Sequence, residues 1–169
     1  MRILKTYVFP ALIVGLALFI DQITKFLAIR HLAPLTEFGP ARDRILIDGF
    51  LRLTFTENDG MALGLLSGWR WLFIVATVVI LAALFYFYIT APKTRIGKIY
   101  QITILVLIGG ALGNFVDRVL RGGFVVDFII FEFFPFVFNF ADVFVVVSVI
   151  GLIVLTLFMK DEKKEKSDA

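Results

Sequence analysis

The sequence predicts an all-α membrane protein with four transmembrane helices and a small extracytoplasmic β-sheet inserted between the first two helices. The 169 residues are 60% hydrophobic, whereas soluble domains are roughly 45–50% apolar. Four apolar stretches are long enough to cross a bilayer, which takes about 20 residues. A segment that alternates between apolar and polar residues lies between the first two stretches. These three observations exclude a soluble globular domain and a disordered chain.

The four predicted spans cover about residues 6–23, 71–92, 99–116 and 136–159. The second and third contain no charge, and the fourth contains only Asp142. The first follows Arg2 and Lys5 as a signal peptide would, but no small-x-small cleavage site follows it, so we interpret it as a retained helix. We therefore expect one membrane-embedded domain over residues 1–160 and a charged tail over residues 161–169.

The predicted outer insertion, residues 24–70, contains the β signal. Leu51, Leu53 and Phe55 alternate with polar residues, which is the period of a half-buried strand. The N-D-G sequence at 58–60 is a turn signal. We expect a small sheet here, and a second outer connection over residues 117–135.

Lysine and arginine residues set the predicted orientation. The seven residues 92–98 contain Lys93, Arg95 and Lys98, a much higher density of positive charge than in the long insertion. We therefore place this connection and both termini in the cytoplasm. The net charge is +3, and the basic residues flank the apolar runs instead of forming one stripe. This distribution favours contact with membrane lipid and predicts no nucleic-acid partner.

The sequence lacks the residues that several kinds of catalytic or cofactor-binding site require. The chain has no cysteine and one histidine, His31, which excludes a cysteine nucleophile and gives a Ser-His site little support. The H-E-x-x-H zinc motif, the P-loop and the dinucleotide fingerprint are all missing from the sequence. We therefore expect no metal and no cofactor.

The predicted topology brings polar residues to one depth at the outer side of the bilayer. Asp21 and Asp117 lie at the outer ends of the first and third spans, Asp127 lies in the second outer connection, and Asp142 lies about two turns into the fourth span, roughly 9 Å deep. Three amides fall at the same level: Asn58, Asn114 and Asn139. Ionisable groups at membrane depth are costly and suggest a functional site.

Each group also has a local explanation. Asp117 and Arg118 could form an ion pair at a helix end, and Asp21 with Lys25 could be an interfacial pair. Asn139 followed by Asp142 resembles a helix cap with an acid in the first turn. These explanations account for single residues, but not for the number of polar groups that share one depth.

Two chemistries use carboxylates at this depth. Two neighbouring carboxylates can share one proton and act on water as base and acid, which would permit peptide hydrolysis. Buried acids can also move protons or ions, so a small proton-coupled transporter or channel remains the alternative.

Five motifs in this order resemble the bacterial lipoprotein signal peptidases (signal peptidase II). They are D-Q-I-T-K at 21–25, N-x-G at 58–60, G-A-L-G-N-x-x-D-R at 110–118, V-V-D-F at 125–128 and F-N-x-A-D at 138–142. The resemblance implies a four-helix aspartyl protease of the bacterial inner membrane, acting at its outer face. The implied substrates are prolipoproteins that are cut just before a cysteine carrying diacylglycerol, and we expect a monomer.

The resemblance also implies residue roles. Asp127 and Asp142 correspond to the catalytic pair. Four residues would line the substrate groove: Asn58, Asn114, Arg118 and Asn139. Three would shape or hold the site: Asp21, Gly60 and Asp117. The chain departs from the family's usual pattern at Met61, where an alanine is common, and at Val143, where a serine is common.

Overall fold

Four long helices form the membrane-crossing part of the molecule. The computed structural model describes residues 7–36, 39–60 and 68–167, with side chains up to Phe158. The helices are α1 (Phe9–Leu32), α2 (Arg70–Thr90), α3 (Arg95–Leu120) and α4 (Phe140–Ser167). Each contains a segment long and apolar enough to span a bilayer. The prediction of four helices that could span a membrane is thereby confirmed.

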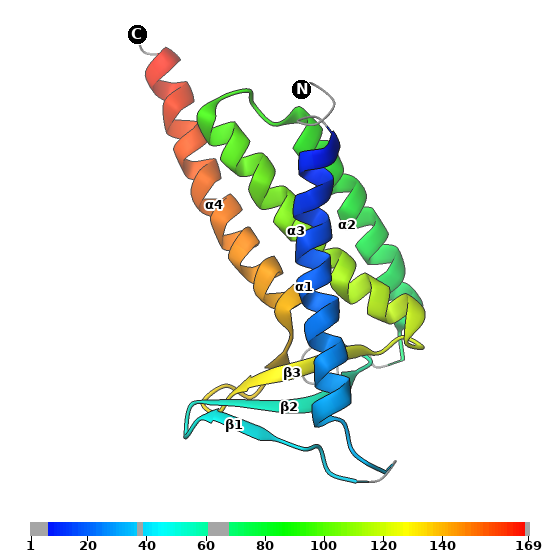
Figure 1. The fold of residues 1–169 in the computed structure, drawn as a ribbon. Coiled ribbons are helices and arrows are strands. Elements are labelled where there is room, and N and C mark those ends of the chain that lie inside the picture. Colours follow the sequence, from blue (N-terminus) through cyan, green and yellow to red (C-terminus); the bar gives the residue numbers. More distant parts are fainter. Residues whose placement is uncertain (1–6, 37–38, 61–67, 168–169) are drawn as a thin grey trace.

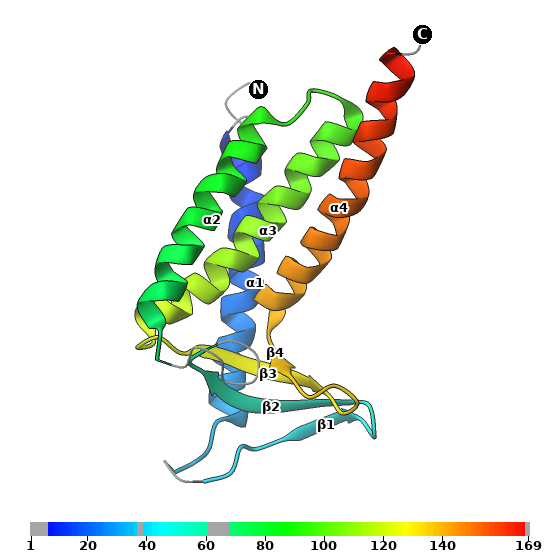
Figure 2. The ribbon, with the colours of Figure 1, turned by 180° about the vertical axis from the view of Figure 1, so that it is seen from behind.

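Helix α3 lies at the centre of the bundle, with α1, α2 and α4 packed around it (Figures 1 and 2). Its glycines permit this close approach. A Cβ on Gly109 would collide with Ala17 of α1, and one on Gly110 would collide with the Ala141 carbonyl of α4. Helix α2 has no buried residue, and many of its apolar side chains are exposed, as contact with lipid requires.

The start of α1 and the end of α4 lie at one end of the bundle, and a four-stranded antiparallel sheet lies at the other (Figure 1). The strands are β1 (Arg44–Ile47), β2 (Leu51–Asn58), β3 (Val125–Phe131) and β4 (Val137–Phe138), hydrogen-bonded in that order. The predicted strand at 51–56 is confirmed as β2. Half of the sheet, however, comes from the connection between α3 and α4, where no strand was expected.

Two of the helices have other ends than the predicted spans. Helix α1 continues to Leu32 rather than ending near residue 23, because the polar residues Asp21 and Lys25 are buried against other helices and do not end it. Helix α4 begins at Phe140 rather than 136, because residues 137–138 form β4. Asp142 therefore lies in the first turn of α4 and not two turns inside it. At its other end, α4 extends through Ser167, into the predicted tail.

The sheet is attached to the bundle through the end of α1. Ala28 and Leu32 of α1 form a buried apolar cluster with Val126 and Phe128 of β3. Because successive side chains of a strand point to opposite faces, Asp127 faces away from this cluster. The attachment thus directs one carboxylate of β3 toward the opposite side of the sheet.

Candidate active site

Asp127 is held by side chains from two different elements. It lies in the middle of β3 and is only 3% exposed. The amide of Asn58, at the end of β2, donates to Oδ2 of Asp127 at 2.9 Å. The amide of Asn139, just before α4, donates to Oδ1 at 2.6 Å. Both carboxylate oxygens therefore have a neutral amide donor.

Asp142 is held at the start of α4 by a reciprocal cap. Its backbone N–H donates to Oδ1 of Asn139 at 3.0 Å, and the backbone N–H of Asn139 donates to Oδ2 of Asp142 at 3.1 Å. The predicted helix cap is thus confirmed. Asn114 of α3 donates to the other oxygen of Asp142 at 2.7 Å. Asp142 is only partly buried, so one side of this carboxylate remains accessible.

The asparagines link the two carboxylates into one network. The amide nitrogen of Asn139 lies 3.1 Å from Oδ1 of Asn114, in addition to its bond with Asp127. A continuous path therefore runs from Asp127 through Asn139 and Asn114 to Asp142. Fixed amides of this kind orient both carboxylates and leave them without a neutralising cation in direct contact among the described residues.

The environment of Asp127 changes its acidity. Burial raises the pKa of this carboxyl from 3.8 to about 7, and the negative charge of Asp142 acts in the same direction. The hydrogen bonds from Asn58 and Asn139 oppose this rise in pKa because they favour the ionised form. Asp127 therefore binds a proton below about pH 7.

A second cluster of acids lies beside the first and is ion-paired. Lys25 Nζ contacts Asp21 Oδ2 at 2.9 Å and Asp117 Oδ2 at 3.0 Å, and all three side chains are fully buried. Lys25 also donates to Asn114 Oδ1 at 2.9 Å. Arg121 adds a contact to Asp117 at 3.1 Å. Lys25 is therefore a central part of the site, although its spacing from Asp21 had suggested a pair at the membrane interface.

The ion-paired cluster also binds the backbone next to Asp127 and Asp142. Asp117 accepts the backbone N–H of Val126 at 3.2 Å, immediately before Asp127. Asp21 accepts the backbone N–H of Ala141 at 2.9 Å, immediately before Asp142. Each ion-paired aspartate thus fixes the residue that precedes one member of the amide-linked pair.

Arg118 and Gly60 lie together at another side of the site. The guanidinium of Arg118 lies 4.7 Å from the ring centre of Phe73 and donates to the Gly60 carbonyl at 3.3 Å. The Gly60 N–H donates to Asn58 at 3.0 Å. The ion pair between Asp117 and Arg118 that the sequence suggested is not formed. Lys25 and Arg121 contact the Asp117 carboxylate instead.

All nine predicted site residues therefore lie in two adjoining networks. The predicted site residues did not include Lys25, Gln22 or Arg121, although Gln22 and Lys25 belong to the D-Q-I-T-K motif at 21–25. Gln22 donates to both of those aspartates at 3.1 Å. Met61 lies outside the described residues, and Val143 is half-buried on α4. Within the described part of the chain, no group of three or more acidic, histidine or cysteine side chains could hold a metal.

Comparison with known proteins places this architecture in a family. The family model described as "Signal peptidase (SPase) II" matches residues 13–158. The lipoprotein signal peptidase of Caldanaerobacter subterraneus subsp. tengcongensis is 44% identical over 146 residues, which cover 86% of this chain and 94% of that relative. The lipoprotein signal peptidase of Streptococcus pyogenes serotype M2 is 37% identical over 144 residues, covering 85% and 88%.

A solved structure has the same fold. It is described as a bacterial membrane enzyme determined by the in meso method at 2.3 Å resolution, and it superposes with a TM-score of 0.78 at 34% identity, covering 94% of this chain and 93% of that one. The match of the family model along most of the chain, the similar relatives and the shared fold lead to one conclusion: this bacterial membrane protein is a protease that belongs to the signal peptidase II family.

Proposed function

We propose that the chain cleaves diacylglyceryl-modified prolipoproteins immediately before the lipidated cysteine, with Asp127 and Asp142 as an aspartyl pair. The observation that carries this proposal is the amide-linked network, which joins two carboxylates from β3 and α4; no cation of the described residues forms an ion pair with either. Processing of lipoprotein signal peptides is the activity of the family. The identity of the carboxylates and the position of the cut are the proposed parts.

The environments of the two carboxylates support different roles. Asp127 is buried, has a pKa of about 7 and can hold a proton at neutral pH. Asp142 is partly exposed and can reach water. In the proposed step, ionised Asp142 removes a proton from water as the water oxygen bonds to the scissile carbonyl carbon, while Asp127 protonates the carbonyl oxygen.

The collapse of this intermediate completes the balance of atoms. The C–N bond breaks, the proton held by Asp142 moves to the leaving nitrogen, and Asp127 recovers its proton from the tetrahedral hydroxyl. The products are a signal peptide with a new carboxyl end and a lipoprotein with a free amino group on its first cysteine. No metal or cofactor is needed for this sequence.

The supporting residues then have distinct proposed roles. Asn58, Asn114 and Asn139 orient the carboxylates through their hydrogen bonds. Arg118 lies beside the pair and interacts electrostatically with both acids, so it can bind peptide carbonyl groups near the cut. Four residues outside the reacting centre hold its shape: Asp21, Asp117 and Lys25 through ion pairs, and Gly60 through its contacts with Asn58 and Arg118.

The decisive experiment is cleavage of a lipidated precursor by purified single variants in detergent, with no ion gradient present. Asp127→Asn and Asp142→Asn should each lower kcat by about 10⁴-fold or more, because the acids act as a unit. Asp48→Asn is the matched control, since Asp48 is an exposed aspartate in the β1–β2 turn. Substantial turnover by either folded variant would contradict the proposed pair.

The same assay tests the substrate and the alternative of a transporter. A precursor without diacylglycerol should be cleaved poorly, because the lipid positions the scissile bond at the membrane surface. Equal rates with and without the lipid would contradict this part of the proposal. A transporter or channel would show no precursor cleavage in detergent.

We further propose that both termini are cytoplasmic and that the site faces outward. Because the chain has no native cysteine, single cysteines report topology cleanly. An impermeant thiol reagent should label Asp48→Cys in the β1–β2 turn of intact cells, and should not label Lys93→Cys between α2 and α3. The reverse pattern would invert the proposed orientation.

A further inference from the structure

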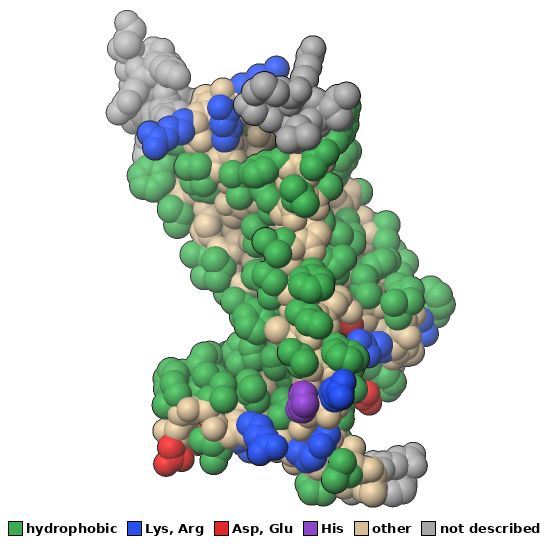
Figure 3. Space-filling model, viewed as in Figure 1, with side chains coloured by type: hydrophobic (Ala, Val, Ile, Leu, Met, Phe, Trp, Pro, Cys, Tyr) green, Lys and Arg blue, Asp and Glu red, His purple; other side chains and the backbone are tan. Residues whose placement is uncertain are grey.

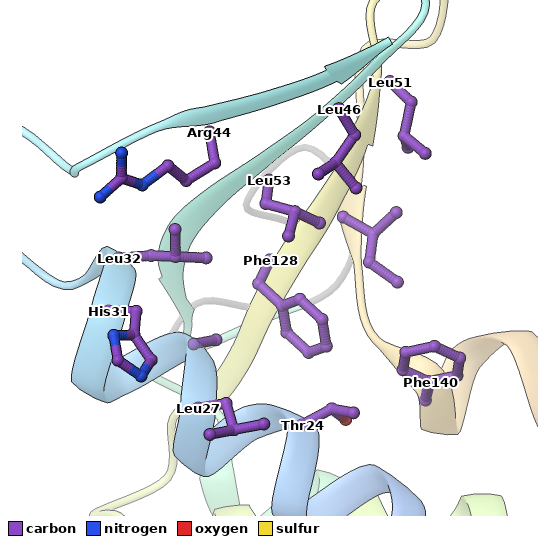
Figure 4. A pocket seen from close by; sticks show the side chains of 12 residues that line it. Thr24, Leu27, His31, Leu32, Arg44, Leu46, Leu51, Leu53, Phe128 and Phe140 are labelled. Atoms are coloured by element: carbon purple, nitrogen blue, oxygen red, sulfur yellow. The ribbon is translucent and has the colours of Figure 1, made fainter.

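An apolar cavity lies beside the sheet. It has a volume of about 440 Å³ and lies between the last turns of α1, the sheet and the start of α4. Figure 4 shows Leu46, Leu53 and Phe128 pointing into it from the sheet, with Leu27 of α1 and Phe140 of α4 closing its sides. None of the nine predicted site residues is among the residues that line this cavity. The cavity is therefore separate from the proposed active site.

The lining of this cavity is suited to hydrocarbon. Apart from Thr24, His31 and Arg44, all of its lining side chains are apolar. Leu27 is 45% exposed and Leu46 is 56% exposed, so the cavity opens to the surface of the molecule. An apolar cavity of this size holds water poorly, whereas an acyl chain can enter it from the bilayer at little cost.

Basic side chains lie at one end of the cavity. Figure 4 places His31 and Arg44 together at the end of the pocket opposite to Phe140. Among the described residues, neither side chain has a hydrogen bond or an ion pair. The nearest acid in sequence, Asp43, is already bonded to Arg52 and Thr54. Exposed Arg30 on α1 adds a further positive charge beside His31.

The basic end and the apolar end of the cavity are placed as the headgroup and the acyl chain of a lipid in the leaflet on the sheet side would be. Phe140 is the first residue of α4, a helix that could span a membrane, whereas His31 lies near the end of α1, which extends beside the sheet (Figure 1). Figure 3 shows the apolar surface of the bundle giving way to basic side chains around His31. A lipid with its headgroup at His31 and Arg44 would thus direct an acyl chain along the cavity toward the bilayer.

We infer that this cavity binds one anionic phospholipid, with an acyl chain between α1, the sheet and α4 and with its phosphate at Arg44 and His31. The basic residues in the last turn of α1 also complement its helix dipole. That explanation does not extend to Arg44, which lies on β1. A diacylglycerol could offer the same acyl chains, but it has no phosphate for the two unpaired basic side chains. The phospholipid is therefore the occupant that uses the whole site.

The test measures the thermal midpoint of the delipidated full chain in detergent with four additives. These are dioleoylphosphatidylglycerol, dioleoylphosphatidylcholine, dioleoylglycerol and glycerol 3-phosphate. Phosphatidylglycerol should raise the midpoint by about 5 °C or more. Phosphatidylcholine and dioleoylglycerol should give clearly smaller shifts, and glycerol 3-phosphate should give none, because both the chains and the charge are needed.

Two variants connect that shift to the cavity. Arg44→Gln should reduce the shift produced by phosphatidylglycerol to the level produced by phosphatidylcholine, and Leu46→Ser should reduce the shifts from both phospholipids. Arg95→Gln, at the other end of the bundle, is the matched control and should respond as the wild type does. Because Arg44 and Leu46 are exposed, both variants should fold.

Four outcomes would overturn the inference. A shift in Arg44→Gln equal to that of the wild type would exclude Arg44 as a phosphate ligand. An equal shift with dioleoylglycerol would indicate a site for uncharged lipid, and an equal shift with phosphatidylcholine would show no preference for negative charge. A shift with glycerol 3-phosphate alone would indicate a site for free phosphate esters. Each readout is independent of precursor cleavage, so it stands apart from the proposed active site.

Discussion

The two pairs of aspartates lie side by side and differ in what binds them. Asp21 and Asp117 share the ammonium group of Lys25, and all three side chains are fully buried. Asp127 and Asp142 instead receive hydrogen bonds from asparagine amides and backbone N–H groups. An ion pair fixes the charge of a carboxylate, whereas neutral donors fix its position and leave its proton exchangeable. The comparison therefore separates acids that hold the structure from acids that can perform proton transfer.

The contacts between the two pairs explain why both are needed. Asp117 and Asp21 accept the backbone N–H groups of Val126 and Ala141, which immediately precede Asp127 and Asp142. The ion-paired cluster is thus the support for the amide-linked pair. A change in the ion-paired cluster should lower stability and also distort the geometry of the site. A change in the amide-linked pair should lower activity in a protein that remains folded.

The largest effect should come from Lys25→Met. This change removes the cation between two buried carboxylates, which leaves uncompensated charge inside the protein. Loss of one partner from a buried ion pair costs about 3–5 kcal/mol, so the thermal midpoint should fall on the order of 10 °C. Lys98→Met, at an exposed position of α3, is the control. A midpoint for Lys25→Met equal to that of the control would show that the cluster does not hold the structure.

Two helix caps sharpen the comparison through activity. Asn139→Ala removes the cap of α4 and the bridge to Asp127, whereas Thr94→Ala removes only the cap of α3, a bond to Gly97 N. Loss of either cap should cost about 1 kcal/mol of stability, and Asn139→Ala additionally loses its buried side-chain hydrogen bonds. Only Asn139→Ala should also lower kcat, by about 100-fold, because the carboxylates lose their alignment. Equal kcat values in these two variants would mean that Asn139 acts only as a cap.

A smaller effect should come from the contact between α1 and α3. A Cβ on Gly113 would collide with the Asp21 carboxylate, whereas a Cβ on Gly15 would meet open space. Gly113→Ala should therefore destabilise the protein by about 1–3 kcal/mol, and Gly15→Ala should be neutral or slightly stabilising. Thermal unfolding of the two variants checks this; a neutral Gly113→Ala would show that the helices can separate without loss of the ion pairs.

Much of this arrangement could be predicted from the sequence, because membrane topology restricts where acids can lie. Four uninterrupted apolar runs gave the spans, and the spans placed the aspartates and asparagines at one end of the bundle. The strand β3 was missed because Val125–Phe131 is almost continuously apolar around Asp127, and its two faces are both covered, so it lacks the alternation that reveals a half-buried strand.

The partners of the acids could not be predicted in the same way. Lys25 lies four residues after Asp21, a spacing that fits either a surface pair or a buried pair. The choice depends on Asp117, which is distant in sequence and reaches Lys25 only when α1 packs on the glycines of α3. The sequence likewise indicated that Asn139 could cap α4, but not that the same amide would bind Asp127 from β3.

The most direct test of the comparison is the pH dependence of kcat/KM for precursor cleavage. Because burial raises the pKa of Asp127 to about 7, the protonated form that donates to the substrate decreases above that pH. The account therefore predicts that kcat/KM falls about tenfold per pH unit above about pH 7.

Two variants give this measurement its control. Asn58→Leu removes a hydrogen bond that lowers the pKa of Asp127, so the fall in kcat/KM should move to higher pH. Arg121→Gln removes a cation from Asp117 in the ion-paired cluster and should leave the fall where it is in the wild type. A profile that stays flat to pH 9, or a fall that moves in Arg121→Gln and not in Asn58→Leu, would contradict the account.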